Sequence, residues 1–543
     1  MNRPIRTAAD IGRGLAAARH ARSVIPGERI HVLGAAGAGA SAAAYLAARA
    51  GAAVTACDPG APSPYTPPLE ALGISVTPAH DAAHVTTDGR TPLVDRLGVT
   101  KALTAIAPDH PELAAARALG VPVEPWQQVV ADAAATSGAR LVAVAGTHGK
   151  SSSAGWLTEL LVGAGRDPGA FVGALMPAAV TGGFPGTARW GEGPVFVVEA
   201  DEYAGNFDPY RPSVAVLLNA EWDHPDVFAD QDAVLRALES WIRRIAGGGE
   251  PPPTLVVNIG DPGAAAVARR LADWDGDLVA VALAYAEAAD DRDLARASVG
   301  LEAQFRTARG PARGAAARIL GADVSGTTIE IVVSGLAPGA SGAGEEPPVA
   351  RLSVPGRHVV QNALCVAAAA LLLGVPAADV VRGLEAFRGV GRRRELKGEP
   401  RGIAVLDDYA HHPTAIAATL AAVRQRYPGR RVWAVYEPLT YHRTAALLDR
   451  FADVLASGAE EVVIADIWAG RDPDTSIASA EGLATAVRER GLPSAAAPGD
   501  VLATANYLAA RVIPGDVVLV MGGGHSYRIA ERLVDLLTST IAW

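Results

Sequence analysis

Lysine is almost absent from this chain of 543 residues, because its 48 basic residues include lysine only at Lys101, Lys150 and Lys397. Acidic residues number 58, which gives a net charge of −10. A chain with no basic surplus, basic tail or Lys/Arg-dense helix is not expected to bind nucleic acid or anionic membranes non-specifically. We therefore expect small-molecule partners, and any lysine in a distinctive setting becomes a candidate functional residue.

Cysteine and long apolar runs are scarce as well. Cys57 and Cys365 are too few and too far apart to indicate a disulfide framework or a zinc cluster, which favours a reducing cytoplasm. The longest apolar run, Ala363–Val375, has 13 residues, and a bilayer span needs ~18 to 20. We expect a cytoplasmic protein with no membrane span. The arginine-rich stretch 3–22 lacks an apolar signal core and predicts an extra amphipathic helix.

What the chain does contain is a regular alternation of short apolar runs, bounded by glycine, with long Ala/Leu/Arg stretches. This pattern indicates α/β structure with mostly parallel sheets, and the length allows several domains of ~100 to 200 residues. A first unit, 1–137, has predicted strands at Arg29–Leu33, Ala53–Ala56, Lys101–Ala107 and Val121–Pro125, with helices ending at Arg49 and spanning Pro111–Leu119. We expect it to be a Rossmann-like domain.

Two more units follow. The second, 138–394, has predicted strands at Leu141–Ala145, Val195–Val198, Val214–Leu218 and Leu255–Val257, and Gly/Pro-rich surface loops at 247–253 and 335–348. The third, 395–543, has predicted strands at Ile403–Leu406, Val432–Tyr436, Val462–Ala465 and Val517–Met521. We expect a central α/β domain with a mostly parallel sheet and a Rossmann-like C-terminal domain.

The sharpest motif lies between the strand Leu141–Ala145 and the following helix: Gly146, Thr147, His148, Gly149, Lys150, Ser151 and Ser152. Glycines at this point let backbone N–H groups surround phosphates, a lysine binds the β- and γ-phosphates, and a serine hydroxyl binds Mg²⁺. The general phosphate loop has a further glycine where this chain has Val144, so only the shorter form of the motif is complete.

Carboxylates and a histidine follow the next two strands of the second unit. Glu199 comes directly after Val195–Val198, and His224 follows Val214–Leu218. Ligands bind at the carboxyl ends of parallel strands, so we expect Ser151, Glu199 and His224 to form a divalent-metal site beside the phosphate loop.

A weaker glycine loop, Gly34, Gly37 and Gly39, follows the first strand, and Asp58 lies where a ribose-binding acid is expected. Ala36 replaces the glycine that a dinucleotide fingerprint requires. A nicotinamide dehydrogenase is therefore the rival class, but it leaves Lys150, Glu199 and His224 unexplained.

These pieces together resemble the Mur ligase family over nearly the whole chain. The matching stretches are Gly146–Ser152, Glu199–Tyr203, Asn219–His224, Pro355–His358 with Asn362, Gly389–Arg393 and Asp407–Pro413. The resemblance implies an N-terminal domain that binds a UDP-sugar through Gly34, Gly37, Gly39 and Asp58, a central ATPase domain, and a C-terminal domain that closes over ATP and brings the amine.

The resemblance also implies roles for single residues. Lys150 would stabilise the transferred phosphoryl group, Glu199 and His224 would hold Mg²⁺, His358 and Asn362 would lie near adenine, Arg393 and Asp408 would contact the nucleotide, and His411 and Arg443 would face the reacting carboxylate and phosphate. The implied reaction converts the carboxylate of UDP-N-acetylmuramate to an acyl phosphate, which an amine then attacks.

Within the family the sequence looks most like the branch that adds L-alanine, with features of the branch that adds a preformed tripeptide. Departures from the family pattern at Ala36, Val359 and Leu439–Thr440 leave a third hypothesis, a catalytically idle Mur-like binding protein. The expected partners are UDP-N-acetylmuramate and an amino acid or short peptide, and the expected state is a monomer or weak homodimer.

Overall fold

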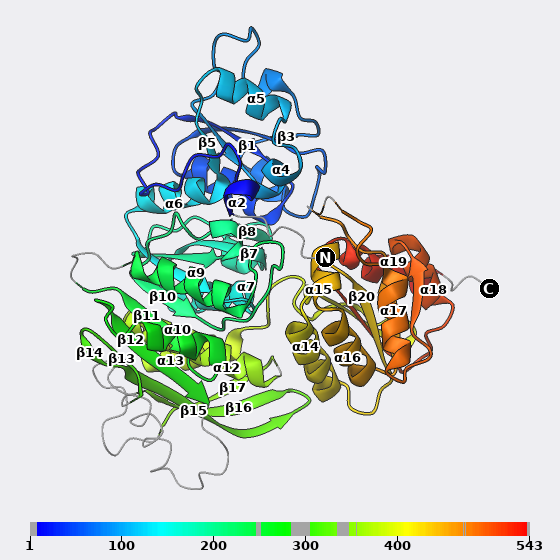
Figure 1. Cartoon of the computed structure of the whole chain (residues 1–543). Coiled ribbons are helices and arrows are strands. Elements are labelled where there is room, and N and C mark those ends of the chain that lie inside the picture. Colours follow the sequence, from blue (N-terminus) through cyan, green and yellow to red (C-terminus); the bar gives the residue numbers. More distant parts are fainter. Residues whose placement is uncertain are drawn as a thin grey trace.

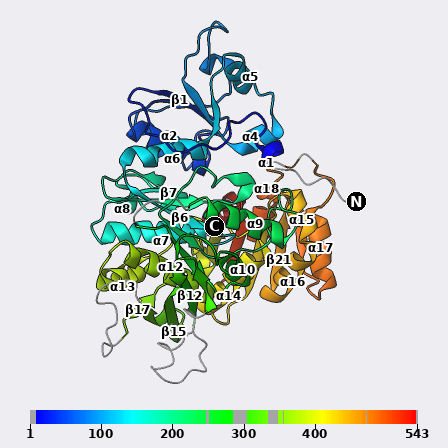
Figure 2. The same cartoon turned by 60° about the vertical axis from the view of Figure 1, so that its left-hand side comes forward.

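A computed structural model describes residues 8–245, 251–283, 304–333, 347–354, 356–470, 472 and 474–539. Its three main sheets form an N-terminal, a central and a C-terminal unit (Figure 1). In both views the N-terminal unit lies against one end of the central unit, and the C-terminal unit lies beside it (Figures 1 and 2). The expected α/β class with mostly parallel sheets is confirmed.

The N-terminal sheet is entirely parallel, in the order β3-β2-β1-β4-β5. Its strands are β1 (Arg29–Leu33), β2 (Ala53–Cys57), β3 (Val76–Thr77), β4 (Arg96–Val99) and β5 (Val123–Pro125). The helices are α1 (Ala8–Ile11), α2 (Ala38–Arg49), α3 (Pro67–Glu70), α4 (Lys101–Ile106), α5 (Pro111–Ala118) and α6 (Trp126–Ser137), with a 3₁₀ turn η1 (Ala82–His84).

The central sheet has ten strands in the order β17-β16-β15-β12-β11-β10-β6-β9-β7-β8. They are β6 (Arg140–Ala145), β7 (Gly169–Met176), β8 (Gly186–Arg189), β9 (Val195–Ala200), β10 (Val214–Leu217), β11 (Thr254–Asn258), β12 (Asp277–Leu283), β15 (Arg313–Asp323), β16 (Gly326–Val333) and β17 (Val349–Leu352), with a separate hairpin of β13 (Arg306–Thr307) and β14 (Gly310–Pro311). Pairing is parallel in the middle and antiparallel at both edges.

The helices of the central unit pack on both faces of this sheet. They are α7 (Lys150–Gly163), α8 (Ala178–Thr181), α9 (Gln231–Arg243), α10 (Pro262–Arg270), α12 (Arg357–Leu372) and α13 (Ala377–Ala386), with a 3₁₀ turn η2 (Tyr203–Gly205). The apolar run predicted around Ala363 is α12, and its buried face packs in the same core as α7. Burial of so many apolar side chains supplies the main stabilisation of this unit.

The C-terminal sheet has the order β18-β19-β23-β20-β21-β22 and is parallel except at β18. Its strands are β18 (Glu395–Gly398), β19 (Ala404–Asp408), β20 (Val432–Glu437), β21 (Glu461–Ala465), β22 (Ala496–Gly499) and β23 (Val517–Gly522). The helices are α14 (Pro413–Arg426), α15 (Tyr441–Ala446), α16 (Leu448–Gly458), α17 (Ala480–Glu489), α18 (Val501–Ala509) and α19 (Ser526–Ser539), with a 3₁₀ turn η3 (Pro400–Gly402).

One predicted strand, Lys101–Ala107, is wrong. The strand is the preceding segment β4, whose residues Arg96–Val99 are all buried, and Lys101 begins helix α4 instead. Thr100 caps that helix by accepting a hydrogen bond from the backbone N–H of Ala102 at 3.4 Å. Threonine favours this position because its hydroxyl satisfies an otherwise free amide.

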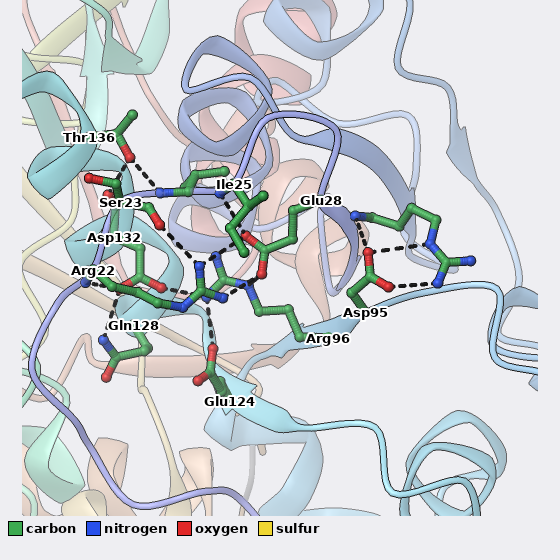
Figure 3. A network of polar contacts seen from close by, with 12 residues as sticks. Arg22, Ser23, Ile25, Glu28, Asp95, Arg96, Glu124, Gln128, Asp132 and Thr136 are labelled. Carbon is green, nitrogen blue, oxygen red and sulfur yellow. Dashed lines mark hydrogen bonds and ion pairs between the residues drawn. The ribbon is translucent and has the colours of Figure 1, made fainter.

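The expected amphipathic helix near the N-terminus is also wrong for the described residues. Helix α1 ends at Ile11, and Gly14, with a φ of +77°, redirects the chain. The arginines that follow form ion pairs instead of a helical face: Arg19 Nη2 lies 2.6 Å from Asp132, and Arg22 Nη2 lies 2.5 Å from Glu28. The segment is thereby fixed against β1 and α6 (Figure 3).

Figure 3 shows the centre of this network, Arg96. Its guanidinium contacts Glu28 at 3.2 Å, Glu124 at 2.9 Å and Asp132 at 2.5 Å, and it is 2% exposed. A buried arginine is tolerated only when carboxylates neutralise it. The network therefore joins β4, β5 and α6 to the N-terminal segment.

The predicted loops at 247–253 and 335–348 lie mostly outside the described residues, as does Pro355 of the predicted adenine motif. Among the helices of the described ranges, none combines the length and the apolar character that a bilayer crossing requires.

Candidate active site

A cavity of about 370 Å³ lies where the three units meet. Its lining includes Lys101 and Trp126 from the N-terminal unit, Lys150, Ser151, Glu199 and His224 from the central unit, Arg393 from the segment that connects the central and C-terminal units, and His411 and Arg443 from the C-terminal unit. All the residues predicted to act on the reacting groups therefore share one space. Lys101, which the sequence places in a solvated strand, instead faces this cavity and donates to the carbonyl oxygen of Ala204 at 2.6 Å.

The predicted phosphate loop joins β6 to α7. Gly146 has a φ of +137°, and a Cβ atom there would lie 2.9 Å from the carbonyl oxygen of Asn219. Gly149 has a φ of +80°, and a Cβ atom there would lie 2.6 Å from the Asn362 side chain. Glycine is required at both positions because other residues avoid this backbone region and would collide.

Side chains at the end of β10 anchor the loop. The backbone N–H of His148 donates to the Asn219 side chain at 2.7 Å, and the Asn219 amide donates back to His148 O at 2.9 Å. The Thr147 hydroxyl bonds to the backbone of Glu221 in the same way. These paired bonds hold the loop in one conformation, which preorganises an anion-binding site.

Lys150 lies at the start of α7, surrounded by carboxylates. Its Nζ lies 2.9 Å from Glu202 Oε2 and 3.4 Å from Asp201 Oδ1. Burial opposes the charge of this lysine, but the two carboxylates outweigh burial and raise its pKa above the ordinary value. Lys150 is therefore a permanent cation in the cavity.

The three predicted metal ligands divide between two neighbouring groups. The Ser151 hydroxyl donates to Glu199 at 3.1 Å, and Gly173 N donates to the same carboxylate at 2.6 Å. His224 instead has its ligand atom within 4.8 Å of those of Asp201 and Glu202. Oxygen-rich groups such as these suit Mg²⁺, which binds one or two carboxylates together with phosphate oxygens.

Burial raises the pKa of Glu199 although Lys150 acts in the opposite direction. A cation bound at this carboxylate would favour its charged form. The residues therefore fit a divalent cation, provided that Asp201 and Glu202 are counted with the predicted ligands.

A second group joins the loop to the C-terminal unit. Glu221 lies 3.1 Å from His148 Nε2 and 3.8 Å from His412 Nδ1. It also accepts hydrogen bonds from Thr414 at 2.8 Å and from Arg450 at 2.6 Å. Burial opposes ionisation, but these donors outweigh it and hold the pKa of Glu221 far below its usual range.

Arg443 is predicted to face the reacting groups, and it does line the cavity. Its Nε and Nη2 atoms form a two-point contact with Asp223 at 2.7 and 3.1 Å, and Nη2 lies 3.2 Å from His224 Nδ1. Arg443 is 2% exposed and Asp223 is 3% exposed. A buried ion pair of this geometry fixes the orientation of the guanidinium and joins the central unit to the C-terminal unit.

The remaining predicted groups lie nearby, in the segment that leads into the C-terminal unit and in that unit itself. Arg393 Nη2 donates to Ser151 Oγ at 3.1 Å, and its guanidinium lies 4.8 Å above the centre of the Tyr409 ring. His411 bonds through Nδ1 to Tyr409 O at 2.8 Å. Burial and the neighbouring Arg443 lower the pKa of His411 well below its ordinary value, so the ring is neutral near pH 7.

A second cavity of about 240 Å³ shares His148, Gly149 and Arg393 with the first. Its lining also includes Ser152, His358, Asn362 and Asp408. Burial, aided by Arg394, lowers the pKa of His358 to about 3, so this ring too is neutral. Most of the surface of this cavity is apolar, and Glu199, Asp201 and Glu202 do not line it.

The glycine loop of the N-terminal unit is less directly connected to these cavities. Only Gly39 lines the first one, where a Cβ atom would lie 2.2 Å from the Trp126 ring. Gly34 and Gly37 form the turn after β1, closed by the Gly37 N–H to Gly34 O bond of 3.0 Å. Asp58 accepts from the Ala36 N–H at 3.0 Å, so its carboxylate also stabilises this loop.

Sequence reasoning did not single out Glu221, Asp223 or Tyr409 as site residues. Glu221 and Asp223 lie within the motif that ends at His224, and Tyr409 lies between the predicted Asp408 and His411. Their positions within these motifs could have identified them as site residues. Their pairing with Arg443 and Arg450 could not have been predicted, because it arises only when two units meet.

A buried lysine on a phosphate loop, carboxylates around it and a third unit over it define an enzyme that uses a nucleoside triphosphate inside a closed site. The comparisons with known proteins agree. Residues 29–137 match the Mur ligase family, catalytic domain, and residues 392–524 match the Mur ligase, glutamate ligase domain. The chain belongs to the Mur ligase family.

Curated relatives match most of the chain. A UDP-N-acetylmuramate–L-alanine ligase of Kineococcus radiotolerans is 37% identical and covers 94% of this chain and 96% of its own. One from Frankia casuarinae is also 37% identical, over 82% of this chain and 84% of its own.

Among solved structures, the UDP-N-acetylmuramate–alanine ligase of Thermotoga maritima matches with a TM-score of 0.70 at 23% identity, over 94% of this chain and 99% of that one. A murein peptide ligase of Psychrobacter arcticus matches with a TM-score of 0.65 at 24% identity, over 95% of this chain and all of that one. Both show the same fold.

Proposed function

We propose that this protein uses ATP to join L-alanine to the muramoyl carboxylate of UDP-N-acetylmuramate, a step of peptidoglycan precursor synthesis. Relatives at 33 to 37% identity over most of the chain are named for this activity. The observation that carries the proposal is the cavity in which Lys150, Arg393 and Arg443 converge from two units while the N-terminal unit closes the third side.

The chemistry follows from these groups. A carboxylate oxygen of the sugar attacks the γ-phosphorus of ATP and ADP leaves, which gives an acyl phosphate. The amine nitrogen of alanine then attacks the carbonyl carbon, loses a proton, and phosphate leaves from the tetrahedral intermediate. Lys150 would stabilise the negative charge that spreads over the transferred phosphoryl group. Arg443, fixed by Asp223, would face the acyl phosphate.

We keep Ser151, Glu199 and His224 as the proposed Mg²⁺ ligands and add Asp201 and Glu202 as neighbours that could share the cation. When bound, Mg²⁺ would offset the charge of the phosphates. Ser152, His358, Asn362 and Asp408 would form the adenine side, and Gly34, Gly37, Gly39 and Asp58 the UDP-sugar side. We propose the ranges 1–137, 138–394 and 395–543 as the three functional domains.

Enclosure of the site supports this proposal because an acyl phosphate hydrolyses in water. The ring of His411 beside the cavity is neutral, and its lowered pKa makes it a weak base, so it is better suited to hydrogen bond the reacting groups than to take a proton from the amine. We further propose a cytoplasmic location, where ATP and UDP-sugars are made, and a monomer or weak homodimer as the working state.

The test measures phosphate release from ATP, Mg²⁺ and UDP-N-acetylmuramate with L-alanine, glycine, L-serine or L-alanyl-γ-D-glutamyl-diaminopimelate as acceptor. We expect release with L-alanine and none without the sugar nucleotide. Release with the tripeptide alone would refute the proposed acceptor but keep the ligase chemistry. Absence of release with every acceptor would favour an idle binding protein.

A further inference from the structure

A second set of metal-binding side chains lies inside the N-terminal unit, away from the cavities described above. It contains four of the 12 histidines of the chain, one of its two cysteines and one glutamate. The members are His31, Cys57, His80, His84, His110 and Glu112. None of them appears among the residues that line the two active-site cavities.

The group is buried and joins four parts of the fold. His31 lies on β1 and is 1% exposed, Cys57 ends β2, and Glu112 in the first turn of α5 is fully buried. His84 ends the η1 turn. Apolar side chains surround the group, among them Leu33, Val85, Leu97 and Leu113. A cluster of this polarity inside an apolar core costs free energy unless a ligand or complete hydrogen bonding compensates it.

The distances between the donor atoms fit a tetrahedral ion. His31 Nε2 lies 3.3 Å from Cys57 Sγ and 3.7 Å from Glu112 Oε1, and Cys57 Sγ lies 3.4 Å from the same oxygen. Ligands at Zn–N, Zn–O and Zn–S distances of ~2.0 to 2.3 Å stand ~3.3 to 3.8 Å apart at the corners of a tetrahedron. His84 Nδ1, 2.5 Å from Glu112 Oε1, is the fourth ligand atom, and all four ligand atoms lie within 4.8 Å of one another.

Hydrogen bonds to side chains outside the four ligands orient the group in the way that metal sites require. His31 Nδ1 lies 2.7 Å from the Thr55 hydroxyl, and a ring that donates there leaves the lone pair of Nε2 toward Cys57 and Glu112. His80 Nδ1 lies 3.1 Å from Cys57 Sγ and 3.5 Å from the second oxygen of Glu112.

His110 supplies an independent sign of a missing partner. Its side chain is 9% exposed, and its Nδ1 atom is buried without a hydrogen bond, 3.8 Å from Glu112 Oε2. The hydrogen bonds inside the protein therefore do not satisfy the cluster completely.

We propose that His31, Cys57, His84 and Glu112 bind a structural Zn²⁺ ion, with His80 and His110 around it. A thiolate and a carboxylate balance the two charges of the cation, and two neutral imidazoles complete four ligands. Thiolate and imidazole ligands favour zinc over Mg²⁺ and Ca²⁺, which prefer oxygen ligands. The buried position leaves no open coordination site for a substrate, so the role is structural: the ion ties β1, β2, η1 and α5 together.

Ionisation of the ligands is consistent with this site. Burial acts to raise the pKa of Glu112, but its contacts with His31 and His84 outweigh burial and lower that pKa to about 2. Burial and the Glu112 charge raise the pKa of the Cys57 thiol, so zinc binding would release one proton from this thiol.

The test uses the full-length, untagged enzyme, incubated with ZnSO₄ in excess Mg²⁺ and then passed through a desalting column. Elemental analysis should find one zinc per chain. Removal of zinc with a chelator should lower Tm by about 5 °C or more, and ZnSO₄ should restore it. Replacement by Co²⁺ should give the absorption of a tetrahedral site with a thiolate-to-cobalt band.

Variants locate the ion. Cys57→Ser should lose the thiolate-to-cobalt band, and His84→Ala, which changes a partly exposed side chain, should lose stoichiometric zinc while remaining folded. Cys365→Ser and His20→Ala are the matched controls and should keep both signals. Less than a fifth of an equivalent of zinc in the wild type would overturn the proposal. So would zinc that persists in His84→Ala and disappears in His224→Ala, because the ion would then belong to the active-site cavity.

Discussion

Lys150 shows at the scale of one residue why a chain that otherwise uses arginine keeps a lysine. Its ammonium group fits between Glu202 and Asp201 at 2.9 and 3.4 Å, in a loop whose glycines leave no room for side chains. The guanidinium of arginine is wider and planar, and it directs its donors in a fixed fork. The loop at position 150 therefore requires a side chain with both the positive charge and the small head group of lysine.

We expect Lys150→Ala to lower kcat for phosphate release by at least about 100-fold, because one preorganised charge that stabilises the transferred phosphoryl group is lost. Affinity for UDP-N-acetylmuramate, measured by calorimetry without ATP, should stay within about twofold because that site lies on another unit. Lys150→Arg should be nearly as inactive as the alanine variant.

The control is Lys397→Arg, since Lys397 pairs with Glu395 and Glu531 on the C-terminal unit and does not line the cavities. It should keep full turnover. Wild-type rates in Lys150→Arg would show that any cation suffices and would remove the argument from size.

At this scale the sequence predicted which side chains would lie together, while their roles stay predictions. Lys150, Ser151, Glu199, His224, Arg393, His411 and Arg443 all line one cavity, as their motifs indicated. What it could not predict is the pairing. Asp223 binds a residue 220 positions away, and no local pattern reports a contact of that length.

At the scale of elements, a buried carboxylate at the end of β20 accepts hydrogen bonds from backbone N–H groups at the start of α19. Glu437 is 4% exposed and accepts a hydrogen bond from the Ser526 N–H at 2.7 Å. Burial raises the pKa of Glu437 to about 7, although the backbone N–H groups of Ser526, His525 and Gly524 act in the opposite direction. Burial therefore outweighs the favourable position at a helix N-terminus.

This raised pKa predicts how stability depends on pH. The folded state binds the Glu437 proton more tightly than the unfolded state, so the contribution of this group is complete below its ordinary value of 4.5 and is lost as pH rises through 7. The loss amounts to at most about 3 kcal/mol. Glu437→Gln mimics the neutral form, so its Tm should match the wild type at pH 5 and exceed it by several degrees at pH 8.

Thermal unfolding of wild type and variant across this pH range measures the difference directly. Glu461→Gln, a change in a partly exposed glutamate on β21 of the same sheet, is the control and should shift little with pH. A Glu437→Gln variant that falls below the wild type at pH 8 would mean that the charged carboxylate stabilises α19.

Helices and strands were predicted well where periodic apolar runs exist, as in β1, β6, β9, β20 and β23. The segment after Val99 was mistaken for a strand because Lys101–Ala107 is as apolar as β4, and only the Thr100 cap distinguishes them. The histidine cluster of the N-terminal unit had no signal at all. Its members span 31 to 112, and only the pairing of β1 with β2 and the position of α5 bring them together.

At the scale of the whole molecule, a small set of side chains joins the central and C-terminal units. The contacts include Arg393 to Ser151, His412 to Trp222 O, Thr414 and Arg450 to Glu221, and Arg443 to Asp223. The connecting segment holds Arg392 and Arg394 at positive φ values of 58° and 56°. Strained backbone at a junction, with few contacts across it, suits a unit that moves as a body.

The ion pair of Asp223 and Arg443 is the strongest of these contacts, because both groups are buried and two guanidinium nitrogens bond to the carboxylate. Replacing one partner leaves the other charge without compensation, at a cost of about 3 kcal/mol or more. Opening of the C-terminal unit relieves that cost by exposing Arg443 to water. We therefore expect Asp223→Asn to shift the nucleotide-free enzyme toward an open form, with a larger radius of gyration in small-angle X-ray scattering.

Asp232→Asn, a change in an exposed carboxylate of α9, is the control and should scatter like the wild type. Unfolding of the variant would also enlarge the protein, so its circular dichroism must match the wild type. A scattering curve that does not change in Asp223→Asn would mean that the other contacts between the units are sufficient to hold them together.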